Sequence, residues 1–185
     1  MKSILLLPLG DVDRGLIEDL SPLLEETFDT RVEIQPYALD LGQFHDAERL
    51  QYNSTKILYH IATNHVAAGP REQNPKGRKI LAVMALDLYI PVLTYVFGEA
   101  ELGGRVSVVS YHRLAPERYG LPRNRSLLLD RIWKEAVHEL GHAFGLVHCP
   151  VQLCVMHSSS YVEDIDLKGG HFCTSCRRGL VSPGL

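Results

Sequence analysis

Residues Val137 to Met156 read VHELGHAFGLVHCPVQLCVM, and this stretch decides the fold that we expect for the chain. It contains three histidines, His138, His142 and His148, at the spacing HExxHxxGxxH. Apolar residues recur at helical intervals from Ser126 to about Val147, which predicts a helix there. Residues four apart share a face of a helix, so the first two histidines can bind one ion.

The remainder of the histidine motif predicts a catalytic metal site. Gly145 permits a sharp turn after the helix, so that His148 can return as a third ligand. Three imidazoles leave a tetrahedral Zn²⁺ with one open position for water. Glu139, next to His138, can then act as general base on that water and pass the proton to the departing amine.

The alternative interpretation is a helix whose histidines only cap or pack. That alternative is serious for HExxH alone, because two histidines and a glutamate are common on helix surfaces. The added Gly145 and His148 at fixed offsets, with a methionine after them, favour the metal site.

Four cysteines lie in the last fifth of the chain and predict a second metal site. Cys149 and Cys154 have the spacing CxxxxC, and Cys173 and Cys176 have the spacing CxxC. Together they make a four-thiolate set, which has no open position and should be structural, clamping the C-terminal region. Two disulfides or a redox CxxC remain as alternatives.

Length and composition favour one globular domain without a nucleic-acid or membrane role. The chain has 185 residues, of which 45% are hydrophobic and 22% charged, and a net charge of -3. There is no basic field for nucleic acid and no apolar run of transmembrane length. The N-terminal apolar run is interrupted by Pro8 and lacks a cleavage site, so we expect a cytoplasmic protein. We also expect a monomer.

The hydrophobic pattern predicts a mixed sheet with helices against it, of the α/β (α+β) class. Alternating or continuous apolar runs predict strands at Ser3–Leu9, Arg31–Gln35, Lys79–Leu86, Leu93–Phe97 and Arg105–Arg113. Helical spacing predicts helices over Asp13–Phe28, from Asn53 to about Val66 with a stop at Gly69 and Pro70, and over the histidine segment. The stretch Asp40–Gln51 reads as a loop or a short helix.

The segments HELGHAFGLVHC, CVM and CTSC closely resemble the archaemetzincins, a family of the metzincin clan of zinc metallopeptidases. YVFGEA, starting at Tyr95, and the lead-in KEAVHE are also similar to that family. The resemblance implies a compact metzincin-like domain: a mixed twisted sheet with an antiparallel edge strand, packed against an active-site helix. It further implies a single domain over 1–185, in which 1–148 carry the sheet and helices and 149–185 the methionine turn and a zinc-clamped end.

The resemblance also implies a role for individual residues. His138, His142 and His148 would bind the catalytic zinc, Glu139 would be general base and acid, and Met156 would form the apolar floor beneath the metal. Cys149, Cys154, Cys173 and Cys176 would bind a structural zinc, giving two Zn²⁺ per chain. Arg105–Arg113 would be the sheet edge that pairs with an extended peptide. His157 and Tyr161, which follow Met156, are secondary candidates for polarising the substrate or stabilising an oxyanion.

We therefore expect a zinc metallopeptidase or aminopeptidase that acts on a peptide or protein substrate. The competing hypothesis is a zinc-stabilised interaction module with little or no turnover. Glu139 discriminates between the two hypotheses, because a pure binding site has no need of a base beside an open metal position.

Overall fold

The structure, a computed structural model, describes residues 3–65 and 77–181. Its main sheet has five strands in the order β2-β1-β5-β8-β7. The strands are β1 (Ser3–Pro8), β2 (Arg31–Ile34), β5 (Arg78–Met84), β7 (Gly98–Ala100) and β8 (Val106–Ser110). β7 runs antiparallel to β8, and the other pairings are parallel. The sheet is therefore mixed, with its one antiparallel strand at an edge, as predicted.

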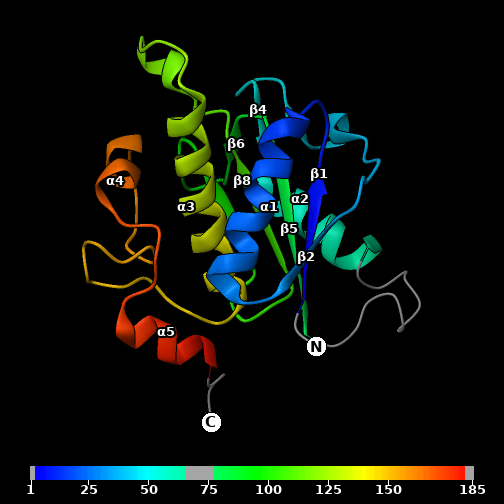
Figure 1. Cartoon of the computed structure of the whole chain (residues 1–185). Coiled ribbons are helices and arrows are strands. Elements are labelled where there is room, and N and C mark those ends of the chain that lie inside the picture. Colours follow the sequence, from blue (N-terminus) through cyan, green and yellow to red (C-terminus); the bar gives the residue numbers. More distant parts are fainter. Residues whose placement is uncertain (1–2, 66–76, 182–185) are drawn as a thin grey trace.

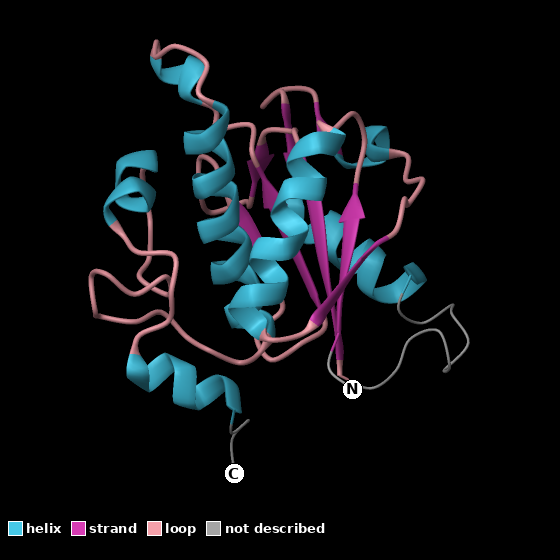
Figure 2. Cartoon of the chain, viewed as in Figure 1, coloured by secondary structure: helices cyan, strands magenta, loops and turns pink. Residues whose placement is uncertain are grey.

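Helices cover both faces of this sheet (Figures 1 and 2). In β1, Ile4 and Leu6 face the core shared with α1 (Arg14–Phe28) and α3 (Arg125–Ala143). Leu5 and Leu7, on the opposite face, belong to a second core with α2 (Ser54–His60). Continuous apolar character in β1 thus reflects a strand buried on both faces, as the pattern predicts for an inner strand.

Shorter elements connect these layers. A three-stranded sheet contains β3 (His45–Asp46), β4 (Gln51–Asn53) and β6 (Leu88–Tyr89). Single-turn helices are η1 (Leu41–Phe44) and η3 (Pro116–Tyr119), and a π-turn η2 (Ile61–His65) extends α2. The helix predicted from Asn53 is thereby confirmed as far as residue 65, and its predicted stop at Gly69 and Pro70 lies outside the described residues. Within Asp40–Gln51 the helical turn is present, followed by β3.

The prediction that Arg105–Arg113 forms the sheet edge is wrong. Its regular part, β8, lies between β5 and β7, and all five of its residues are buried. The serines that suggested a wet face are satisfied internally: Ser107 Oγ donates to the Ile80 carbonyl at 3.1 Å, and Ser110 Oγ donates to the Leu86 carbonyl.

The edge strand is β7 instead, and the strand predicted over Leu93–Phe97 is also wrong. These residues form turns, apart from a single bridge between Val96 and Leu88. They lead directly into β7, so the YVFGEA segment supplies the true edge.

The histidine helix α3 is confirmed but ends at Ala143, earlier than predicted. Gly145, with φ of 96°, turns the chain sharply after it. Beyond the turn the chain lies beside α3 and contains two short helices, α4 (Val162–Leu167) and α5 (Thr174–Val181) (Figure 1). Among the described residues, no helix has the length and apolar character needed to cross a membrane.

Candidate active site and metal centres

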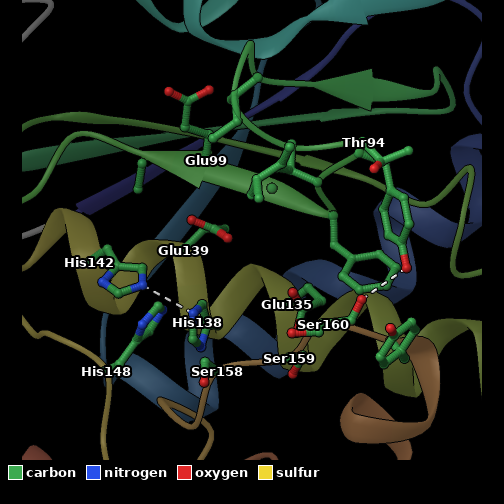
Figure 3. A pocket seen from close by; sticks show the side chains of 18 residues that line it. Thr94, Glu99, Glu135, His138, Glu139, His142, His148, Ser158, Ser159 and Ser160 are labelled. Atoms are coloured by element: carbon green, nitrogen blue, oxygen red, sulfur yellow. Dashed lines mark hydrogen bonds between the residues drawn. The ribbon is translucent and has the colours of Figure 1, made fainter.

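Helix α3 and the turn after it bring the three histidines together. His138 and His142 lie one turn apart on α3, with their Nε2 atoms 3.0 Å apart, and His148 approaches from beyond the turn (Figure 3). One ligand nitrogen from each residue lies within 4.8 Å of the other two. The three histidine side chains therefore converge on one point, as the motif predicts.

Backbone carbonyls fix the orientation of two imidazoles. His138 Nδ1 donates to the Val155 carbonyl at 2.8 Å, and His142 Nδ1 donates to the Leu146 carbonyl at 2.7 Å. Because a carbonyl only accepts, the proton is on Nδ1 and the Nε2 lone pair faces the other histidines. Burial lowers the pKa of both rings, so they are neutral, which is the form that binds zinc. The donor set fits a three-histidine zinc site.

Glu139 is buried between α3 and β7. Its side chain lines a cleft that opens above α3. A side chain at Gly98 of β7 would collide with Glu139, because a Cβ there would lie 2.6 Å from Glu139 Cγ. Burial raises the pKa of Glu139 well above its usual value, and the carboxylate of Glu135 raises it further. The charge of Lys168 acts in the opposite direction.

Glu135 and Lys168 form a buried ion pair next to Glu139. Lys168 Nζ lies 2.8 Å from Glu135 Oε1, and the two side chains are 1% and 4% exposed, respectively. Lys168 Nζ also donates to the His157 carbonyl at 3.3 Å. The pair connects the active-site helix to the segment beyond α4.

A cleft of about 600 Å³ opens over these side chains. One wall is made by residues 90–97 and β7, the floor by α3, and the opposite rim by Ser158 to Tyr161. Figure 3 shows His142, His138 and Glu135 following one another along α3 below β7. The cleft is therefore elongated along an exposed strand edge, a shape suited to an extended chain.

The four cysteines form a second cluster. Their sulfur atoms all lie within 4.8 Å of one another, and all four are free thiols. Cys149 and Cys173 sulfurs are 3.8 Å apart, far beyond the disulfide bond length of about 2.05 Å. A backbone N–H of Cys176 donates to Cys173 and, with the neighbouring thiols, lowers the pKa of Cys173 to about 7. The cluster fits a tetrahedral four-thiolate zinc site.

Comparison with known proteins agrees with this geometry. Residues 42–182 match peptidase family M54. The archaemetzincin of Methanocaldococcus jannaschii is 36% identical over 183 residues, which cover 96% of this chain and 92% of that protein. The chain belongs to peptidase family M54, the archaemetzincins.

Solved structures of the family have the same fold. The zinc-dependent peptidase from Methanocorpusculum labreanum has a TM-score of 0.82 at 33% identity, over 96% of this chain and 99% of that one. The archaemetzincin from Archaeoglobus fulgidus, solved with malonate, has a TM-score of 0.77 at 35% identity, over 95% and 98%. The resemblance drawn from the motifs is confirmed, and the chain is a zinc metallopeptidase by class.

The structure separates the two secondary candidates of this archaemetzincin. Tyr161 lines the rim of the cleft and is 66% exposed. His157 is not among the lining residues, and its Nδ1 donates to the Cys149 carbonyl at 3.0 Å. His157 therefore braces the backbone between the histidine cluster and the cysteine cluster.

Met156, the residue expected to form the apolar floor of the site, is fully buried. It packs directly on Gly141 of α3, where even a methyl group would collide with the thioether. Sequence reasoning missed the ion pair of Glu135 with Lys168, and also Tyr95 in the cleft wall. The KEAVHE segment contains Glu135, but nothing in the sequence pairs it with a lysine 33 positions later.

Proposed function

We propose that this chain hydrolyses peptide bonds, with His138, His142 and His148 binding the catalytic zinc and Glu139 acting as general base. The observation that supports this most is the convergence of three histidine nitrogens, two of them on rings fixed by backbone carbonyls, beside a buried carboxylate. Zinc at such a site lowers the pKa of water and polarises the substrate carbonyl.

Glu139 performs the proton transfers in this proposal. Its carboxylate accepts a proton from the attacking water and returns it to the nitrogen of the departing amine. Its position one residue after His138, and against Gly98, keeps the carboxylate between the metal ligands and β7. Met156 supports the ligands from below by packing on Gly141.

The substrate strand pairs with β7 in this proposal. β8 occupies one edge of β7, and within the described residues no strand pairs with its other edge, next to the cleft. An extended peptide can add there as an antiparallel or parallel strand through backbone hydrogen bonds. This replaces β8 as the peptide-binding edge and keeps the mode of recognition that the sequence predicted.

We also propose an aminopeptidase preference and a second, structural zinc at Cys149, Cys154, Cys173 and Cys176. The described residues that line the cleft include Glu99, Glu139 and Glu135, the last already paired with Lys168, but no lysine or arginine. An α-ammonium group is attracted by such a lining, whereas an α-carboxylate is repelled. His157 and Tyr161 are secondary in this scheme, as backbone brace and as rim residue.

Glu139→Gln tests the proposed chemistry. We expect the variant to keep its zinc and to lose about 10²- to 10⁴-fold in kcat/KM, because an amide cannot accept the proton. The measurement is a peptide-library digest, followed by kcat/KM on the best substrate and by zinc analysis. Glu117→Gln, on the exposed turn η3, is the matched control.

Two outcomes would contradict the proposal. Full turnover in Glu139→Gln would remove Glu139 as the base. Absence of cleavage by the wild-type protein with both sites filled, combined with chelator-sensitive peptide binding, would favour the interaction module instead.

A further inference from the structure

A hydrogen bond crosses the cleft at one end. Tyr95 Oη, from the wall before β7, donates to the Ser160 carbonyl on the opposite rim at 2.9 Å. The dashed line at Ser160 in Figure 3 marks this bond, which lies beyond Glu135 when the cleft is followed from the histidines. The cleft is therefore open along β7 but bridged at this end.

The Tyr95 side of the bridge is held rigidly. The Arg113 guanidinium lies 4.1 Å from the centre of the Tyr95 ring, and Phe97 packs edge-on against the ring at 5.5 Å. Asp87 binds Arg113 through two hydrogen bonds, of 2.5 and 2.7 Å. A bidentate pair of this kind fixes the plane of the guanidinium, and with it the ring.

The Ser160 side is held as well. Backbone N–H groups of Ser160 and Tyr161 donate to Asp164 Oδ2 at 2.8 and 2.9 Å, at the start of α4. These hydrogen bonds, strongest when Asp164 is ionised, lower the pKa of its carboxyl group. Both ends of the bridge are thus anchored by side chains outside the cleft, so the bridge is a built feature of the site.

The distance from the metal ligands to the bridge is short. Tyr95 precedes Gly98 by three residues, and Gly98 lies against Glu139, so at most about 10 Å of chain separates the two. An extended peptide needs about 3.3 Å per residue, so at most about three residues fit between the catalytic side chains and the bridge.

We propose that the Tyr95–Ser160 bridge is a specificity determinant that limits a peptide to about three residues on the side of the cleaved bond that faces the bridge. This inference rests on the proposed peptidase function. Tyr95 acts here by steric limitation at the end of the cleft, and the Asp87–Arg113 pair acts as its positioning group.

The test uses the zinc-loaded full chain and two peptide series built on one cleaved sequence. The first series carries one to five residues before the cleaved bond, and the second varies the length after it. For the wild type we expect kcat/KM to fall at least ~10-fold beyond about the third residue in one series only, the series whose added residues extend toward the bridge. Tyr95→Ala should remove this fall, and Tyr95→Phe should reduce it. Tyr111→Phe also loses a hydroxyl hydrogen bond, to the Asp13 backbone, but lies outside the cleft and should keep the wild-type length profile.

Binding provides a readout that does not need turnover. In the Glu139→Gln background, the Kd of the long peptides should fall at least ~10-fold when Tyr95→Ala is added, while the Kd of one- and two-residue peptides changes much less. A wild-type length profile that is flat in both series, a limit in both series, or an unchanged limit in Tyr95→Ala would overturn the proposal. If the wild type cleaves nothing, the proposed function fails by itself, and the binding series still decides the role of the bridge.

Discussion

Gly141 lies one residue before His142, and its missing side chain sets how closely Met156 can approach α3. The Met156 thioether occupies the space that a Cβ of residue 141 would need, and Phe172 lies close by. The ligand helix and the methionine turn are therefore in direct contact under the metal site. A methyl group added at residue 141 would therefore affect the stability of the protein in two opposing ways.

We expect Gly141→Ala to destabilise the protein by up to about 2 kcal/mol. Alanine is the better helix former by about 1 kcal/mol, but overpacking of a fully buried methionine costs typically 1–3 kcal/mol, and the collision involves buried groups that cannot move to solvent. Urea denaturation of the zinc-loaded protein measures the change.

Gly15→Ala is the matched control, because a Cβ in α1 would meet the flexible end of Arg125 at 3.0 Å and the Asp13 carboxylate at 3.3 Å, and neither group is buried. It should be neutral or stabilising. A stabilised Gly141→Ala variant would show that the methionine turn yields easily and does not fix the ligand helix.

At the scale of elements, α3 is tied to the following segment by buried charges. Arg131 forms a bidentate pair with Asp166 at 2.7 and 2.6 Å, and Lys168 pairs with Glu135 one turn further along the helix. Breaking a buried pair by removing one partner costs about 3–5 kcal/mol, much of it from the charge left without a partner.

Lys168→Met should therefore destabilise the protein by about 3–5 kcal/mol, and adding Glu135→Gln should recover part of that loss. A double-mutant cycle by chemical denaturation measures the coupling. Lys56→Met, at an exposed position on α2, should change stability by less than about 0.5 kcal/mol. Additive single effects would mean that the two side chains do not stabilise one another.

The elements also show what the sequence could and could not predict. Continuous apolar runs identified β1 and β5 as inner strands because burial on both faces leaves no other pattern. The sequence of β8 suggested a solvent-exposed face because it contains Ser107 and Ser110. In the structure both hydroxyls donate to backbone carbonyls of neighbouring segments, so the strand is buried. The metal ligands were predictable because helical spacing and short loops bring them together locally. Partners such as Lys168 and Ser160 were not, since their contacts depend on the path of the chain after the turn at Gly145.

On the scale of the whole molecule, the two proposed metal centres meet at one peptide bond. His148 belongs to one and Cys149 to the other, and the Cys149 N–H donates to the Met156 carbonyl at 2.9 Å. Much of the segment after α3 lacks regular structure. Structural zinc sites contribute roughly 10–16 kcal/mol, comparable to the net stability of a domain, about 5–15 kcal/mol.

Cys173→Ser should lower the zinc content by about one ion per chain and lower the melting temperature. Hydrogen exchange should accelerate over residues 149–173, whereas β1 and β5 should keep their protection. Metal analysis and exchange mass spectrometry measure both effects. Thr174→Ser, at the next position, should behave as the wild type; an unchanged zinc content in Cys173→Ser would remove the four-thiolate site.

The Tyr95 side of the bridge and the proposed zinc ligands are supported by different parts of the chain. Tyr95 is oriented by Asp87 and Arg113, which come before α3, whereas the histidines are oriented by carbonyls at and beyond its end. An engineer could therefore redesign residues 87–97 to alter which peptides are accepted while leaving the hydrolytic apparatus in place. The same separation allows natural selection to change the substrate range of such an enzyme while its catalytic residues stay the same.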